Sequence, residues 1–154
     1  MKKDNKIEPL LFDTYISAIK NSIGSKTYRQ IFAKVNGKKK DITENGNLSC
    51  AYYVTSLLLI FKLVNEVHAT VSGTVRDIEK SGWTQIDKPK VGAIIVWGKK
   101  DFGKGDFHSH IGFYIGKNEA ISNSPKKGIV EKHHFTYKNT RKIEKIFWHK
   151  RLTP

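Results

Sequence analysis

The segment 50–64 constrains the fold most strongly, because its residues are apolar on almost every side of a helix. Ser49 precedes it and belongs to the residue types that cap helix N-termini, so the sequence predicts a helix that begins at Cys50. A helix without a polar face has to be covered by the rest of the chain and is expected at the centre of the fold. Its apolar run, 51–61, is shorter than the roughly 20 residues of a membrane span, so no span is expected.

Helical and strand signals occupy different halves of the chain. Residues 12–23 and 75–80 are predicted to be helical, and 37–41 and 44–47 are predicted to be loops. Short β-rich runs bounded by turn residues then follow, at 91–97, 110–115, 120–124, 128–135 and 143–152. This order predicts an α+β fold in which N-terminal helices pack on an antiparallel sheet. A length of 154 residues predicts a single domain, 1–154.

The chain is strongly basic, with a net charge of +14. Residues 1–49 hold 10 basic and 5 acidic side chains and residues 99–154 hold 13 and 5, whereas the middle third is nearly neutral. Such a surplus predicts attraction to polyanions, whether nucleic acid, an anionic cell-wall polymer or acidic lipid. The N-terminal segment lacks an apolar run long enough for an export signal, which leaves the localisation open.

Cys50 is the one cysteine, so an intramolecular disulfide is excluded and the residue matters, if at all, as a thiol. The start of a helix favours the thiolate, but a lone cysteine beside an apolar stretch can also be a small core residue. A nucleophilic thiol needs an imidazole and a third polar group to orient the ring. Asp106, His108 and His110 alternate along a predicted strand, and an antiparallel hairpin would bring Asn123 beside His110.

Three segments, 47–51, 90–97 and 109–116, resemble in order and spacing the papain-like NlpC and CHAP cysteine peptidases, which break down bacterial cell walls. In those families a cysteine opens a buried helix and a later strand supplies a histidine. The resemblance covers about residues 24–135 and implies a papain-like (NlpC/CHAP) fold with a catalytic core of about 24–152. This chain departs from the pattern in having Ser49, rather than aspartate, before the cysteine.

The resemblance implies that Cys50 is the nucleophile and His110 the general base. Either Asn123 or Ser122 occupies the third position, and we expect Asn123 because a carboxamide reaches and polarises an imidazole better than a hydroxyl does. Candidates for the oxyanion site or for substrate binding are Tyr28, Ser49, His108 and Ser122.

The expected activity is hydrolysis of amide bonds in peptidoglycan stem peptides or cross-bridges, through a thioester, as an endopeptidase or amidase. The same residues could also support acyl transfer or deamidation. We expect a monomer without a cofactor or metal that binds a peptidoglycan or peptide substrate and no specific nucleic acid. An anionic cell-wall polymer is a further candidate partner. Two alternatives are a basic polyanion-binding or nucleic-acid-binding domain with an inert thiol, and a zinc-dependent hydrolase. The zinc site would use His108 and His110 with His133, His134 or His149.

Overall fold

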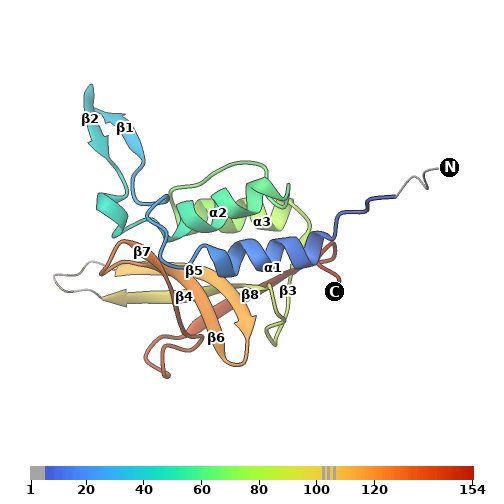
Figure 1. Ribbon diagram of the computed structural model, residues 1–154. Coiled ribbons are helices and arrows are strands. Elements are labelled where there is room, and N and C mark those ends of the chain that lie inside the picture. Colours follow the sequence, from blue (N-terminus) through green and yellow to red (C-terminus); the bar gives the residue numbers. More distant parts are fainter. Residues whose placement is uncertain (1–5, 102, 104, 106) are drawn as a thin grey trace.

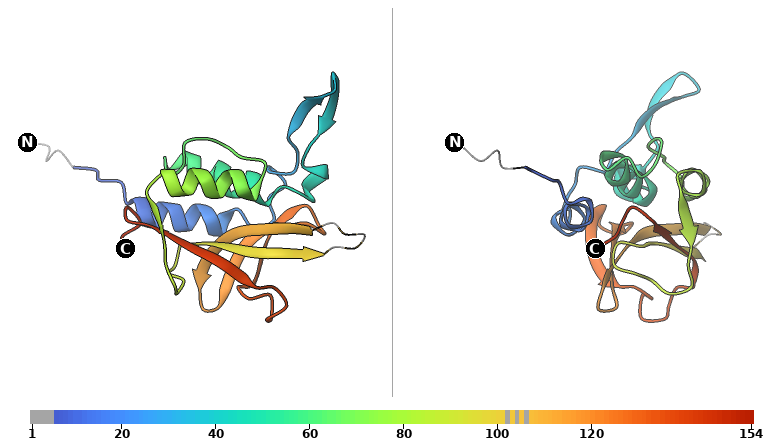
Figure 2. Two further views of the ribbon diagram at one scale, coloured as in Figure 1. Left: turned by 180° about the vertical axis from the view of Figure 1, so that it is seen from behind. Right: turned by 90° about the vertical axis from the view of Figure 1, so that its right-hand side faces the viewer.

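The computed structural model describes residues 6–101, 103, 105 and 107–154 and has an α+β fold (Figure 1). Its helices are α1 (Leu11–Asn21), α2 (Cys50–Ile60) and α3 (Val71–Lys80), and a short 3-10 helix, η1 (Glu44–Gly46), precedes α2. The main sheet consists of β3 (Trp83–Gln85), β4 (Ile94–Asp101), β5 (Phe107–Gly116), β6 (Glu119–Ser124), β7 (Ile129–His134) and β8 (Ile143–His149). Its strand order is β3-β8-β4-β5-β6-β7, with antiparallel neighbours throughout. The three α-helices lie together on one side of this sheet (Figures 1 and 2).

The core lies between the helices and the sheet. The rings of Tyr15 in α1 and Tyr53 in α2 both meet Phe113 of β5 edge to face, with centroids 5.9 and 5.6 Å apart. All three side chains are fully buried, so α2 is the buried helix that its apolar sequence predicts. On the opposite side of the sheet, Trp97 and Ile95 of β4 belong to a second apolar cluster. Because β4 is covered on both faces, its apolar residues are consecutive rather than alternating.

A hairpin of β1 (Phe32–Val35) and β2 (Lys38–Asp41) extends away from the body of the molecule (Figures 1 and 2). The expectation that residues 37–41 form a loop is therefore wrong. Asn36 and Gly37 form the turn with φ values of 51° and 77°, and positive φ at both central residues is typical of a two-residue type I′ hairpin turn.

Two further differences concern where elements begin and end. α2 ends at Ile60 rather than near residue 64, because the chain turns at Lys62, which has a φ of 54°. The short strand β3 was not predicted and is formed by pairing with β8. Among the described residues, no helix combines the length and the apolar character that crossing a bilayer requires.

Candidate active site

The N-terminus of α2 is fixed against the β6–β7 hairpin through Gly46. The carbonyl oxygen of Gly46 accepts hydrogen bonds from Asn123 Nδ2 at 2.9 Å and from Ser49 Oγ at 3.2 Å. A Cβ atom at Gly46 would lie 2.5 Å from the Cα atom of Gly128, so this close approach requires glycine. These contacts position the start of α2, whose first residue is Cys50.

His110 is buried in β5, and its Nε2 atom lies 2.9 Å from Ser122 Oγ in β6. Phe113 pairs with Ile121, so the same register places Ser122 opposite Gly112, on the face that also carries His110. A Cβ atom at Gly112 would lie 2.8 Å from Ser122 Cβ and 2.6 Å from the Ile121 carbonyl oxygen. The glycine therefore leaves the space in which Ser122 reaches His110.

Asn123 does not contact His110, contrary to the expectation that its carboxamide orients the ring. The side chain is buried, its amide nitrogen donates to Gly46, and its Oδ1 atom has no hydrogen-bond partner among the described residues. Neighbouring residues of a strand point to opposite faces, so Ser122 and Asn123 cannot both face His110. In this arrangement Asn123 supports the segment that carries Cys50, and Ser122 contacts the imidazole.

The Ser122 hydroxyl lies between two imidazoles and a phenol. It is 2.8 Å from His133 Nε2 and 3.2 Å from the Tyr137 hydroxyl. His133 Nδ1 lies 2.9 Å from the His134 carbonyl oxygen, which can only accept, so Nδ1 carries the proton. Burial lowers the pKa of His133, which leaves the ring neutral and its Nε2 free to accept from Ser122. Ser122 then accepts from the Nε2–H of His110, and the Nδ1 atom of His110 is unprotonated.

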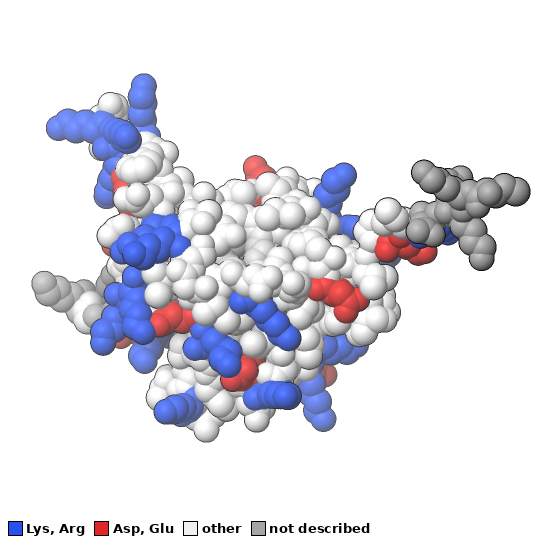
Figure 3. Space-filling model, in the orientation of Figure 1, with Lys and Arg blue, Asp and Glu red and all other residues white. Residues whose placement is uncertain are grey.

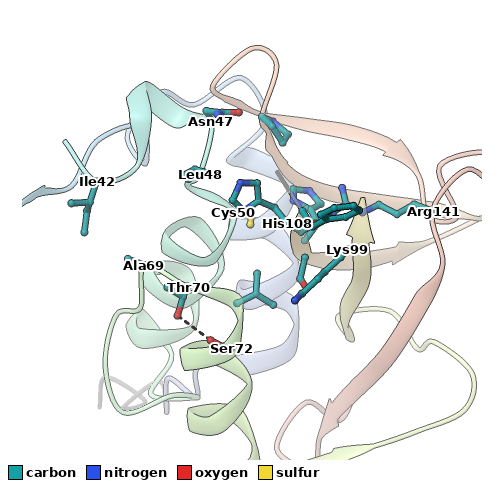
Figure 4. Close-up of a pocket in the computed structure, with 15 residues that line it drawn as sticks. Ile42, Asn47, Leu48, Cys50, Ala69, Thr70, Ser72, Lys99, His108 and Arg141 are labelled. Carbon is teal, nitrogen blue, oxygen red and sulfur yellow. Dashed lines mark hydrogen bonds between the residues drawn. The ribbon is translucent and has the colours of Figure 1, made fainter. Parts of the chain in front are cut away.

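Cys50, His108 and His110 all line one pocket of about 510 Å³ at the N-terminal end of α2. Figure 4 shows Cys50 at the start of its helix, with His108 and Arg141 extending toward the same space from the sheet side. The pocket is lined by Ile42, Asn47, Leu48, Cys50, Ala69, Thr70, Val71, Ser72, Lys99, Phe107, His108, Ser109, His110, Pro125 and Arg141. Within the described part of the chain, no direct hydrogen bond joins the thiol to the His110 ring.

The thiol and the imidazole are both neutral at neutral pH. Burial raises the pKa of the Cys50 thiol, while the backbone N–H of Ile111 and the charge of Arg141 act in the opposite direction. Burial also holds the pKa of His110 well below its ordinary value, and Arg141 and His133 add to this effect. His110 is therefore available as a proton acceptor rather than as an imidazolium ion.

The remaining predicted residues have different surroundings. Tyr28 packs edge to face against Tyr52 and Tyr53 and is not one of the residues that line the pocket. Ser49 is fully buried beneath the helix start and is likewise outside the lining. Asp106 lies outside the described residues.

Sequence reasoning missed Arg141, Lys99 and Tyr137, and it considered His133 only as a metal ligand. Lys99 lies at the register shift in β4, and Tyr137 and Arg141 lie between β7 and β8, where no sequence motif surrounds them. Among the described residues, no group of three or more His, Cys, Asp or Glu side chains is arranged to hold a metal ion. His110 and His133 are instead bridged by Ser122.

Comparisons with known proteins leave the family open. Neither a protein-family model nor a curated protein sequence matches this chain.

Proposed function

We propose that this chain is a papain-like cysteine hydrolase that cleaves amide bonds in peptidoglycan peptides. Cys50 is the nucleophile, His110 the general base, and Ser122 the group that orients the imidazole. The observation that carries the proposal is the hydrogen bond between His110 Nε2 and Ser122 Oγ, beside a pocket that Cys50 also lines. This hydrogen bond occupies Nε2 of His110, so Nδ1 is the ring atom that can accept a proton.

In the acylation step, Nδ1 of His110 takes the thiol proton while Sγ of Cys50 attacks the substrate carbonyl carbon. The new S–C bond forms, the tetrahedral oxyanion collapses and the C–N bond breaks, and the proton passes from His110 to the leaving amine. Backbone N–H groups at the start of α2 are suited to stabilising the oxyanion. Water then attacks the thioester, His110 takes its proton, and the thiolate leaves and is reprotonated.

The neutral resting state fits a base-assisted attack by a thiol. A neutral imidazole can accept the proton as the S–C bond forms, so a pre-formed thiolate–imidazolium pair is not required. Contacts between thiol and ring often tighten only when substrate binds, which is consistent with the lack of a direct thiol–imidazole hydrogen bond among the described residues. The substrate class follows from the resemblance of three segments, including the one around His110, to wall-degrading peptidases.

The test is hydrolysis of purified peptidoglycan by the wild type and by Cys50→Ala and His110→Ala variants. We expect each substitution to reduce turnover by at least about 10³-fold, because each removes a group that acts in the transition state. Thermal unfolding of each variant serves as the control for folding. A folded variant that kept most of the wild-type turnover would contradict the assignment.

Chemical inhibition separates the proposal from the zinc-hydrolase alternative. Iodoacetamide should inactivate the wild type, and a chelator should not. The alkylation rate should rise steadily toward alkaline pH, since the raised pKa of Cys50 keeps the thiol protonated at neutral pH. Inhibition by a chelator alone would favour a metal enzyme.

The hairpin formed by β1 and β2 favours a second candidate, a basic domain that binds a polyanion. Its exposed lysines are Lys34, Lys38, Lys39 and Lys40. That function predicts retention on an anionic polymer with a steep salt dependence and no loss on Cys50→Ala. Hydrolysis that depends on Cys50 would instead make the hairpin an accessory to the enzyme.

A further inference from the structure

Both charged side chains, other than histidines, that line the pocket are cationic. They are Lys99 of β4 and Arg141, which precedes β8, and none of the described lining residues is an aspartate or glutamate. The rest of the wall contains apolar side chains, among them Leu48, Val71 and Phe107. A ligand that fits this lining combines apolar groups with negative charge.

Arg141 is held rigidly beside the candidate reacting groups. Its Nε atom donates to the Gly98 carbonyl oxygen at 3.1 Å, and Nη2 donates to the His108 carbonyl oxygen at 2.6 Å. Its charge lowers the pKa of both Cys50 and His110, which places the positive potential at the groups that would attack a carbonyl carbon. Figure 4 shows its side chain reaching into the pocket toward Cys50.

The N-termini of two helices add positive potential to the same pocket. Cys50 opens α2, and Thr70, Val71 and Ser72, which also line the pocket, form the first turn of α3 with its N-cap. Helix N-termini carry partial positive charge. These termini reinforce the field of Arg141 and Lys99 and do not by themselves define a site.

We propose that the substrate carries a carboxylate close to the scissile amide bond and that Arg141 and Lys99 bind it. This inference rests on the proposed function, because it concerns the pocket in which Cys50 would act. A carboxylate bound there would fix the register of the peptide relative to the thiol. It would also make the enzyme selective for acidic peptides over their amidated forms.

The test uses soluble wall peptides, released from peptidoglycan by a glycan-cleaving enzyme, in two forms. One form is native, and in the other, carbodiimide coupling to ammonia has converted carboxylates to carboxamides. We expect kcat/KM to be at least about tenfold higher for the native form. The ratio of the two kcat/KM values should fall toward one in Arg141→Gln and decrease in Lys99→Gln. Lys20→Gln, an exposed charge on α1, should leave the ratio unchanged.

Using the ratio separates recognition from any general loss of catalysis or stability in Arg141→Gln. Arg141→Lys, which keeps the charge, should retain part of the preference. Equal kcat/KM for both forms in the wild type would overturn the inference while leaving the proposed function intact. Calorimetric titration of Cys50→Ala with both forms tests recognition without turnover, and equal affinity there would overturn the inference as well. Turnover that persisted in Cys50→Ala would overturn the proposed function, and with it the inference that depends on that function.

Discussion

The Ser122 hydroxyl is the group on which the orientation of His110 depends. It is the hydrogen-bond partner of His110 Nε2 and also joins that ring to His133. His133 stacks on Tyr137 with ring centroids 4.1 Å apart and donates to the His134 carbonyl, so its position is fixed. Because Ser122 bonds both rings, the fixed position of His133 also restricts the orientation of His110, the candidate general base.

We expect Ser122→Ala to lower kcat/KM by about 10- to 100-fold, by analogy with metal-ligating histidines, where removing the hydrogen-bond partner of the ring has an effect of this size. The acid limb of the pH–rate profile should also shift, since the tautomer of His110 is no longer fixed. Tyr137→Phe is the matched control, because it removes one contact of Ser122 and leaves both imidazoles bonded. Ser122→Ala with wild-type kcat/KM and pH profile would show that the ring needs no such partner.

Two residues of the candidate site, Cys50 and His110, were predictable because each is recognisable from its residue type and its place in the sequence. A cysteine at the start of an apolar helix and a histidine entering a strand are visible in the sequence, and both line the pocket. The choice between Ser122 and Asn123 was not, because it depends on strand register. The pairing of β5 with β6 shifts between Tyr114 and Gly116, and a shift of one residue exchanges the faces. Side-chain reach, the criterion used for Asn123, does not determine the face.

At the scale of elements, α3 and the loop before it form a pocket wall that depends on one carboxylate. Asp77 is buried and accepts hydrogen bonds from both nitrogens of Asn65, the backbone N–H of Glu66 and the Ser81 hydroxyl. Its Oδ2 atom also lies 2.8 Å from His68 Nε2. Residues 69–72, which line the pocket, lie between His68 and the rest of α3.

We expect Asp77→Asn to lower the free energy of unfolding by about 2–4 kcal/mol at pH 7. The hydrogen bonds of Asp77 hold its folded-state pKa far below the ordinary value of an aspartate, even though burial opposes them. The stabilisation is therefore complete above the unfolded-state pKa and is lost as the pH falls toward the folded-state pKa. Urea unfolding between pH 2 and 7 should show a steeper acid dependence in the wild type than in Asp77→Asn. The exposed Asp13→Asn is the control, and equal slopes would contradict the assignment.

The hairpin of β1 and β2 shows why some elements escape sequence analysis. Its lysine-rich second strand lacks the alternating apolar pattern of a half-buried strand, so composition favoured a loop. The signal that was present is local, in the Asn36–Gly37 turn. Asp41 supports the other end by accepting from the backbone N–H of Thr43 and Asn45. The hairpin is thus specified by its turn and its base rather than by burial.

At the scale of the whole molecule, part of the excess positive charge lies on the hairpin of β1 and β2. Basic side chains gather on the projecting hairpin and on the adjoining side of the molecule in the view of Figure 3. Ile42, which directly follows β2, lines the pocket, so the hairpin arises at the pocket rim. A polymer that contacts the hairpin would be held next to the pocket that Cys50 lines.

If the proposed function is right, we expect the hairpin to contribute to binding of the cell wall and not to the rate of peptide hydrolysis. Replacing Lys38, Lys39 and Lys40 together by Gln should weaken binding to purified wall that retains its anionic polymers by about tenfold or more at low salt. The decline of affinity with rising salt should also become shallower, because fewer counterions are displaced. On a soluble peptide kcat/KM should stay unchanged, since none of these lysines lines the pocket.

The matched control removes the same charge from Lys20, Lys80 and Lys88, which are exposed on α1, on α3 and before β4. If net charge alone drove adsorption, the two triple variants would lose equal affinity, and the hairpin would have no special part in it. If the hairpin variant lost affinity for nucleic acid but not for the wall, the result would favour the alternative function of polyanion binding. We expect the hairpin variant to lose more affinity for the wall than the control variant does, with unchanged peptide hydrolysis. That result would show that wall binding and catalysis depend on different residues.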